Sequence, residues 1–224
     1  MRYAIDPQAR ITWYEHDLIV LMISDNKFHV IRNLPDGFLD DLSGSAKTSQ
    51  FSNVYEALTG IGAVRRCQWG GVGIRANELP KAYLEERWLM PLTPEISPSQ
   101  YRTMRALFAL FRAAYCVKRS GFEGVVSMIA REPSSNTSRA DPAVIIRTAV
   151  ASLNRVFVYD FSGNKCLTYS LALLLMLRRR LPSMRLVVGV KTRPFHSHAW
   201  VEHEGRVIND DPDLRNKLAV ILEA

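Results

Sequence analysis

Three short runs of β-branched and aromatic residues lie in the first third of the chain, and polar breaks separate them. The runs cover residues 11–14, 18–23 and 28–31. The breaks contain Asp, Asn and Ser, which favour turns, so the pattern predicts three strands joined by hairpins. Two stretches with helical spacing follow, at residues 35–42 and 51–61. Three strands followed by short helices are typical of a winged-helix-like module.

Apolar residues in the second half recur at a period near 3.6 and predict three helices. Ser97, which precedes a proline, or Ser99 can cap the first helix, which Gly121 would end. Asp141, which precedes a proline, is a start signal for the second helix, and the third is expected over residues 165–180. Strands are then predicted over residues 185–190, 197–202 and 206–210, with a short helix after Pro212. Helices followed by an antiparallel sheet indicate an α+β fold.

Residues 91–98 contain three prolines, which favour an extended linker. The linker divides the chain into a front module, residues 1–90, and a second domain, residues 99–224. The helix over residues 165–180 is apolar nearly all round. We therefore expect it at the centre of the second domain, packed against the antiparallel sheet.

The composition is that of an ordinary soluble protein, because 47% of the 224 residues are hydrophobic and 23% are charged. The longest apolar run, residues 171–177, is too short to cross a bilayer. The net charge of +7 suits an acidic partner, either a peptide or a nucleic acid, unless the positive charge is simply solvated.

Three cysteines, Cys67, Cys116 and Cys166, lie far apart and do not indicate a disulfide framework. The polar opening of the chain does not predict a signal peptide. We therefore expect a cytoplasmic, reducing location. The residues around Cys67 and Cys116 do not indicate a functional role for either cysteine.

Cys166 follows Gly163 and Asn164, two residues that end the preceding segment. Asn164 is a favourable N-cap, so Cys166 is expected in the first turn of its helix. Unpaired backbone N–H groups and the positive end of the helix dipole favour a thiolate there. The alternative is a small buried hydrophobic residue, the commonest role of an isolated cysteine.

His198 lies on a predicted strand that a hairpin joins to the next. If the turn has three residues, Glu202 faces Arg206 and His198 faces Asp210, at a Cβ separation of about 4.5–5.5 Å. A turn of two residues would place Asp211 opposite His198 instead. The longer turn also pairs opposite charges across the strands, so it is favoured.

Cysteine, histidine and a neighbouring carboxylate are the groups that nucleophilic acyl chemistry needs. Cys166 would be the nucleophile, His198 its base, and Asp210 the group that fixes the imidazole tautomer. The backbone N–H of Cys166 would stabilise the oxyanion, and Asn164 is a candidate for the second donor. His196 could add a metal ligand, but neither Cys-x-x-Cys nor His-Glu-x-x-His spacing is present, so no metal site is expected.

The segments around these residues resemble the lasso-peptide B proteins, which are transglutaminase-like cysteine peptidases. The segments are residues 166–173, 189–190, 195–202 and 205–210. Such proteins remove the leader from a ribosomally made precursor. The resemblance implies a papain/transglutaminase-like domain with Cys166 as nucleophile, His198 as base and Asp210 as carboxylate.

The front module resembles the precursor-recognition module that such proteins carry when both parts are fused in one chain. In modules of that type the leader adds as a strand to the third strand. The matching residues are Lys27, Phe28, His29, Val30, Ile31 and Arg32. A winged-helix-like shape with positive charge would equally suit DNA.

The resemblance also implies an asparagine-synthetase-like cyclase as partner and a dependence on ATP. The sequence has no Walker-type phosphate loop that would locate a nucleotide. Two other functions stay open at this point. One is acyl transfer to an amine by the same three residues, and the other is nucleic-acid binding without catalysis.

Overall fold

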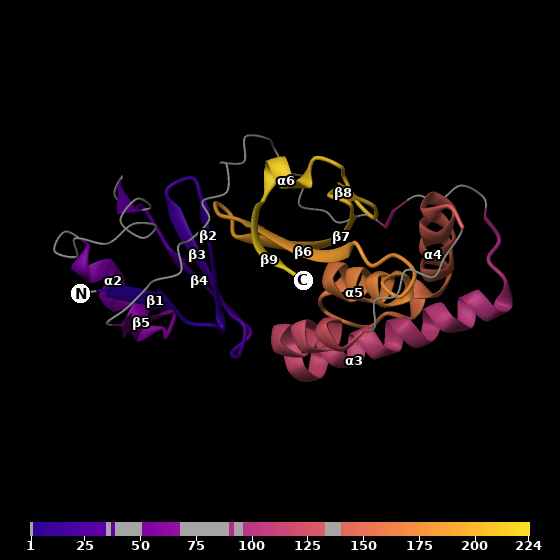
Figure 1. The fold of residues 1–224 in the computed structure, drawn as a ribbon, viewed down its shortest axis with the longest axis horizontal. Helices are drawn as coiled ribbons and strands as arrows, with labels where there is room; N and C mark the ends of the chain where they lie inside the picture. The colour runs from indigo at the N-terminus through magenta and orange to yellow at the C-terminus, as the bar shows by residue number, and fades with distance from the viewer. Residues whose placement is uncertain (1, 35–36, 39–50, 68–89, 92–95, 133–139) are drawn as a thin grey trace.

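The computed structural model describes residues 2–34, 37–38, 51–67, 90–91, 96–132 and 140–224 (Figure 1). Helices and strands are mixed, so the predicted α+β class is confirmed. The helix predicted over residues 35–42 lies almost wholly outside the described residues, and so does the centre of the linker predicted over 91–98. The domain boundaries therefore stay predictions.

The described part of the front module consists mainly of short strands. Its elements are β1 (Arg2–Ile5), β2 (Ala9–Tyr14), β3 (Asp17–Met22), β4 (Lys27–Ile31), α2 (Ser52–Gly60) and β5 (Val64–Cys67). β2, β3 and β4 form an antiparallel sheet in that order, and β1 pairs with β5. The three predicted strands and the helix over 51–61 are confirmed, whereas β1 and β5 have no clear alternation that would predict them.

The second domain places its helices before most of its strands. Its elements are α3 (Gln100–Arg131), α4 (Pro142–Val156), η1 (Phe157–Tyr159), α5 (Lys165–Leu177), β6 (Met184–Lys191), β7 (His196–His203), β8 (Arg206–Val207), α6 (Leu214–Lys217) and β9 (Ala219–Glu223). The Ser99 and Asp141 side chains cap α3 and α4 as predicted. The antiparallel sheet has the order β8-β7-β6-β9, in which β9 is unpredicted and β8 is shorter than expected.

Helix α5 is the centre of this domain, as its apolar sequence predicts. It packs on α3, on α4 and on the β7 side of the sheet (Figure 1). Its residues from Leu167 to Leu174 are all buried. Within the part of the chain that the structure covers, no helix is both long and apolar enough to cross a bilayer.

Gly121 breaks α3, as predicted, but a second helical segment follows at once. Its φ of 52° is one that side chains rarely adopt. A Cβ at this position would lie 2.6 Å from Cγ of Asn26 in the front module. The Asn26 Oδ1 accepts a hydrogen bond of 3.2 Å from the Phe122 N–H, so the break in α3 is also a contact between the two parts of the chain.

Strand β3 contributes to two hydrophobic cores. Ile19 and Leu21 belong to the main core, together with α3, α4 and α5. Leu18, Val20 and Met22 alternate with them and belong to the smaller core of the front module. Because one face of the front sheet is part of the main core, the front module packs directly on the second domain.

Candidate active site

Cys166 lies in the first turn of α5, where the sequence predicts it. Asn164 occupies the N-cap position, but its side chain makes no capping hydrogen bond. The preceding loop is held instead by Ser162, whose hydroxyl donates to Asp160 (2.8 Å) and lies 2.9 Å from the Thr168 hydroxyl on α5. The exposed Asn164 side chain is therefore not committed to the helix end.

His198 is buried on β7 beside α5. Its Nε2–H donates to Oδ2 of Asp210 at 2.8 Å. The same ring also interacts with the Cys166 side chain. Because Nε2 is engaged by the carboxylate, Nδ1 is the nitrogen that faces the sulfur, and the three side chains form one chain of contacts.

The environment of this pair favours its ionised form. Burial alone would raise the pKa of the Cys166 thiol, but the hydrogen bond and charge of His198 and the N–H groups of Ala199 and Leu167 lower it overall. Burial would lower the pKa of His198, yet Asp210 and Cys166 together raise it to about 9. Both shifts favour the thiolate–imidazolium form of the pair.

The three-residue turn predicted after β7 is wrong. The turn consists of Glu204 and Gly205 alone, because the residues on either side of them pair directly. Both have positive φ, 51° and 78°, as the tight two-residue hairpin turn requires. If this register continued, Asp211 would lie opposite His198.

Asp210 nevertheless reaches His198, because regular strand pairing ends early. Strand β8 stops at Val207. Two residues later the side chain of Asn209 takes the place of a backbone carbonyl, and its Oδ1 accepts from the Val201 N–H at 2.7 Å. This departure from the register turns the Asp210 carboxylate toward the imidazole.

Asn209 is a residue that the sequence reasoning missed. It is fully buried, and its Nδ2 donates to the Ser170 hydroxyl at 3.1 Å. The Ser170 hydroxyl donates in turn to the Ala199 carbonyl at 3.0 Å. These bonds join α5, β7 and the segment of Asp210, so they fix the spacing of the three candidate residues. The signal in the sequence that could have indicated its role is a polar residue directly after the apolar pair 207–208.

The predicted pair of Glu202 with Arg206 is also wrong. The shorter turn pairs Arg206 with His203 instead. Glu202 and Arg206 therefore project from opposite faces of the sheet, and Glu202 is buried. There it accepts two hydrogen bonds of 2.7 Å from Arg215 and one of 2.7 Å from the Trp200 indole. A buried carboxylate needs such partners, and they anchor α6 to β7.

A pocket of about 520 Å³ opens onto the sulfur. Cys166, His198 and Asn164 line one part of it. Asn26 and Phe28 of the front module line another part, so two regions far apart in the sequence share the cavity.

Phe28 also joins an aromatic cluster at this pocket. Its ring meets that of Phe122 edge-on at 5.7 Å and that of Phe195 at 5.3 Å. Beside the cluster, Arg193 donates to the buried Asp17 at 3.2 Å and to Asn33. The aromatic contacts hold the start of β4 next to the candidate site, and the Arg193 bonds tie the segment before Phe195 to the opposite end of β4.

The residues expected to bind a leader lie on β4 and directly after it. β4 is an edge strand of the sheet β2-β3-β4 in the described part of the chain. Lys27 opens the strand beside the pocket, and Arg32 follows its far end. His196, proposed as a metal ligand in the alternative interpretation, lines the same pocket, and among the described residues no cluster of three or more metal-binding side chains occurs.

Comparisons with known proteins identify the family of the chain. The profile of the Transglutaminase-like superfamily matches residues 107–223. The chain is 28% identical to the microcin J25-processing protein McjB of Escherichia coli, over 95% of this chain and 97% of that protein. No solved structure matches the chain significantly. The lasso-peptide B resemblance seen in the sequence is thereby confirmed, and the chain belongs to the transglutaminase-like superfamily.

Proposed function

We propose that this chain is a cysteine peptidase that removes the leader from a lasso-peptide precursor. The observation that carries the proposal is the contact of Cys166 with His198 and of His198 with Asp210, at the wall of an open pocket. The similarity to a microcin-processing protein supports the substrate class. The bond cleaved is the peptide bond between leader and core.

The Cys166 thiolate attacks the carbonyl carbon of that bond, and the negative charge moves to the carbonyl oxygen. The N–H of Cys166, in the first turn of α5, and the free Asn164 amide are the donors that we assign to this oxyanion. His198 then gives its proton to the leaving amine. The core peptide departs with a free N-terminus, and the leader remains as a thioester on Cys166.

Water completes the cycle. His198, now neutral, takes a proton from the water that attacks the thioester. The leader leaves with a free carboxyl group, and the thiolate–imidazolium pair is restored. If an amine replaced water, the same residues would catalyse acyl transfer, and the leader would carry that amine as an adduct.

We further propose that the leader adds to the free edge of β4. The scissile bond lies at the C-terminal end of the leader, and the pocket lies at the Lys27 end of β4. The leader must therefore run from the Ile31 end toward Lys27, antiparallel to β4. Five residues of strand span about 17 Å, so the leader is guided over that length to Cys166.

An asparagine-synthetase-like cyclase is the proposed partner, in the reducing cytoplasm that the free thiol requires. Peptide hydrolysis through a thioester consumes only water, whereas ring closure must activate a carboxyl group. We therefore assign the ATP requirement to the cyclase. Leader removal by this chain alone should proceed without ATP.

The test is mass analysis of the precursor after incubation with the purified chain. We expect two fragments that together have the precursor mass plus one water, and no cleavage by Cys166→Ala or His198→Ala. An intact precursor with the wild-type chain refutes the peptidase assignment, and a leader adduct would replace hydrolysis by acyl transfer.

A further inference from the structure

Helix α3 presents an unusual row of large apolar side chains to solvent. Tyr101, Phe108 and Tyr115 are 70–71% exposed, and Met104 and Phe111 are 62% and 53% exposed. The buried face of the same helix uses mostly small residues, among them Ala106, Ala109 and Ala113. An exposed apolar row of this size on a soluble protein marks an interaction site. We call these five large residues the α3 ridge.

The spacing of the α3 ridge is that of a helix–helix contact. The intervals along the chain are 3, 4, 3 and 4 residues, which is the pattern of positions a and d in a heptad. Arg105, Arg112 and Arg119 follow at intervals of seven, at the position next to the seam. In a paired helix that position contacts charged residues of the other helix. A helix with acidic residues at its edges is therefore the matching partner.

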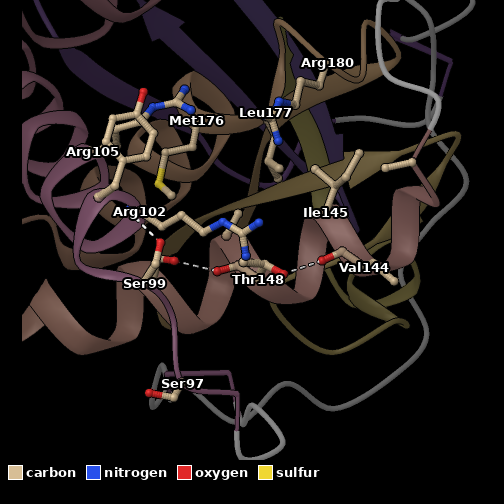
Figure 2. Close-up of a pocket in the computed structure, with 14 residues that line it drawn as sticks. Ser97, Ser99, Arg102, Arg105, Val144, Ile145, Thr148, Met176, Leu177 and Arg180 are labelled. Atoms are coloured by element: carbon tan, nitrogen blue, oxygen red, sulfur yellow. Dashed lines mark hydrogen bonds between the residues drawn. The ribbon is translucent and has the colours of Figure 1, made fainter.

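Two hollows flank the N-terminal half of the ridge. One, of about 340 Å³, lies between α3 and the end of α5 and includes Phe108 and Met176 in its walls. The other, of about 670 Å³, lies between α3, α4 and α5 (Figure 2). Tyr101 lines both hollows. Hollows beside an apolar ridge are suited to receive side chains of a docked protein.

The larger hollow is rich in positive charge. Arg102, Arg105 and Arg180 line it, and Figure 2 shows the Arg102 side chain extending across it toward Thr148. None of these three guanidinium groups forms an ion pair with another described residue. Carboxylates of a partner would supply the missing counter-charges.

The ridge ends about one helix width from the candidate active site. Tyr115 is its last residue, and Val117, two residues further along α3, lines the pocket of Cys166. Two residues rise about 3 Å along the helix axis but turn about 200° around it, so the exposed Tyr115 and the buried Val117 point to opposite sides of α3. A protein seated on the ridge would therefore lie across α3 from the pocket of Cys166, one helix diameter, roughly 10 Å, away.

We infer that the α3 ridge and its arginine-lined hollow dock the enzyme that closes the freed core peptide into its ring, through an apolar helix edged with Asp or Glu. This inference rests on the proposed function. A second copy of this chain is disfavoured as occupant, because its own arginines would meet those of the first copy. A lipid surface would use the ridge and the arginines, but it has no need of the hollows.

The first test measures binding of the purified cyclase to the full-length chain. Phe108→Asp should weaken the affinity at least about tenfold, because it places a charge in the middle of the ridge. The control is Val158→Asp, a similarly exposed residue outside the ridge, which should bind the cyclase like the wild type. Equal affinity of Phe108→Asp and wild type overturns the inference.

The second test addresses charge. Arg102→Glu together with Arg180→Glu should weaken binding at least about tenfold and flatten its dependence on salt, whereas Arg185→Glu, on β6, should not. Two further measurements separate the other occupants. A wild-type dimer that Phe108→Asp dissociates, or binding to phosphatidylglycerol vesicles that Phe108→Asp abolishes while cyclase binding persists, overturns the assignment of the ridge to the cyclase.

Leader cleavage keeps the two proposals apart. Phe108→Asp should cleave the precursor and react with iodoacetamide at Cys166 like the wild type, because the ridge does not touch the three candidate residues. If the wild-type chain does not cleave, the proposed function fails. If it cleaves and the ridge variants bind the cyclase normally, only the docking inference fails.

Discussion

At the scale of single residues, Cys166 differs from Cys116 in both exposure and charge. Cys116 is buried within α3, and burial raises the pKa of its thiol. Cys166 lines a pocket beside His198, and the pKa of its thiol is lowered. We expect iodoacetamide at pH 7 to label Cys166 first, as peptide mass mapping would show. In His198→Ala this preference should weaken, and equal labelling of both cysteines in the wild type would argue against an activated thiol.

The pH dependence of cleavage follows from the same pair. Activity should rise as the Cys166 thiol ionises below its ordinary pKa of 9.0, and it should fall as His198 loses its proton at about 9. Asp210→Asn removes a charge that raises the pKa of His198, so the alkaline limb should move to lower pH. The rate should also drop by roughly one to three orders of magnitude.

Asp211→Asn is the matched control for that change. Asp211 hydrogen-bonds Lys217 and the Asp213 N–H, and these partners lower the pKa of its carboxyl group. It makes no described contact with His198, so the alkaline limb should stay in place. A larger loss of activity in Asp211→Asn than in Asp210→Asn would reverse our assignment of the carboxylate.

At the scale of the elements, the hairpin of β7 and β8 shows what the sequence could predict. Strand alternation placed His198, and the choice between two turn lengths selected Asp210. The predicted length of the turn was wrong, because Glu204 adopts a positive φ that the sequence alone does not require. Asp210 reaches its partner through the buried side chain of Asn209, a tertiary contact that local patterns do not contain.

Replacement of Asn209 tests whether its buried side chain positions Asp210. Asn209→Leu keeps the number of side-chain heavy atoms but removes the hydrogen bonds to the Val201 N–H and the Ser170 hydroxyl. We expect a loss of stability of about 1–3 kcal/mol in urea unfolding. The alkaline limb of the cleavage profile should also move to lower pH, because the carboxylate is no longer held against His198.

The exposed Asn216 of α6 provides the control, since Asn216→Leu makes the same chemical change outside the network. It should leave both the urea midpoint and the pH profile close to those of the wild type. If Asn209→Leu lost stability but kept the wild-type profile, Asn209 would be a structural residue without a positioning role.

At the scale of the whole molecule, the front module and the second domain share a core and a pocket. The sequence predicted the strands of the module, since hydrophobic alternation is a local signal. It did not predict that Ile19 and Leu21 would join the main core beside β9, because both faces of β3 are apolar and the sequence does not indicate which core each face meets. The strand proposed to bind the leader and the candidate catalytic residues are therefore joined by packing.

This arrangement predicts that Phe28, on β4, and Arg32, directly after β4, contribute differently to catalysis. Phe28 lines the pocket of Cys166 and contacts Phe195, whereas Arg32 lies at the opposite end of the strand. Arg32→Glu should raise KM for the precursor and leave kcat near the wild-type value, because it weakens only the binding of the leader. Phe28→Ala should lower kcat about tenfold or more, because the substrate is no longer held against the thiolate.

Steady-state cleavage of the full precursor distinguishes the two effects, and iodoacetamide labelling of Cys166 shows whether each variant keeps the active pair. Were the front module only a tether for the leader, both variants would change KM alone. A fall in kcat confined to Phe28→Ala, with normal thiol labelling, would mean that the recognition strand itself forms one wall of the catalytic pocket. Cleavage would then depend on the packing of the two parts of the chain as much as on the three catalytic groups.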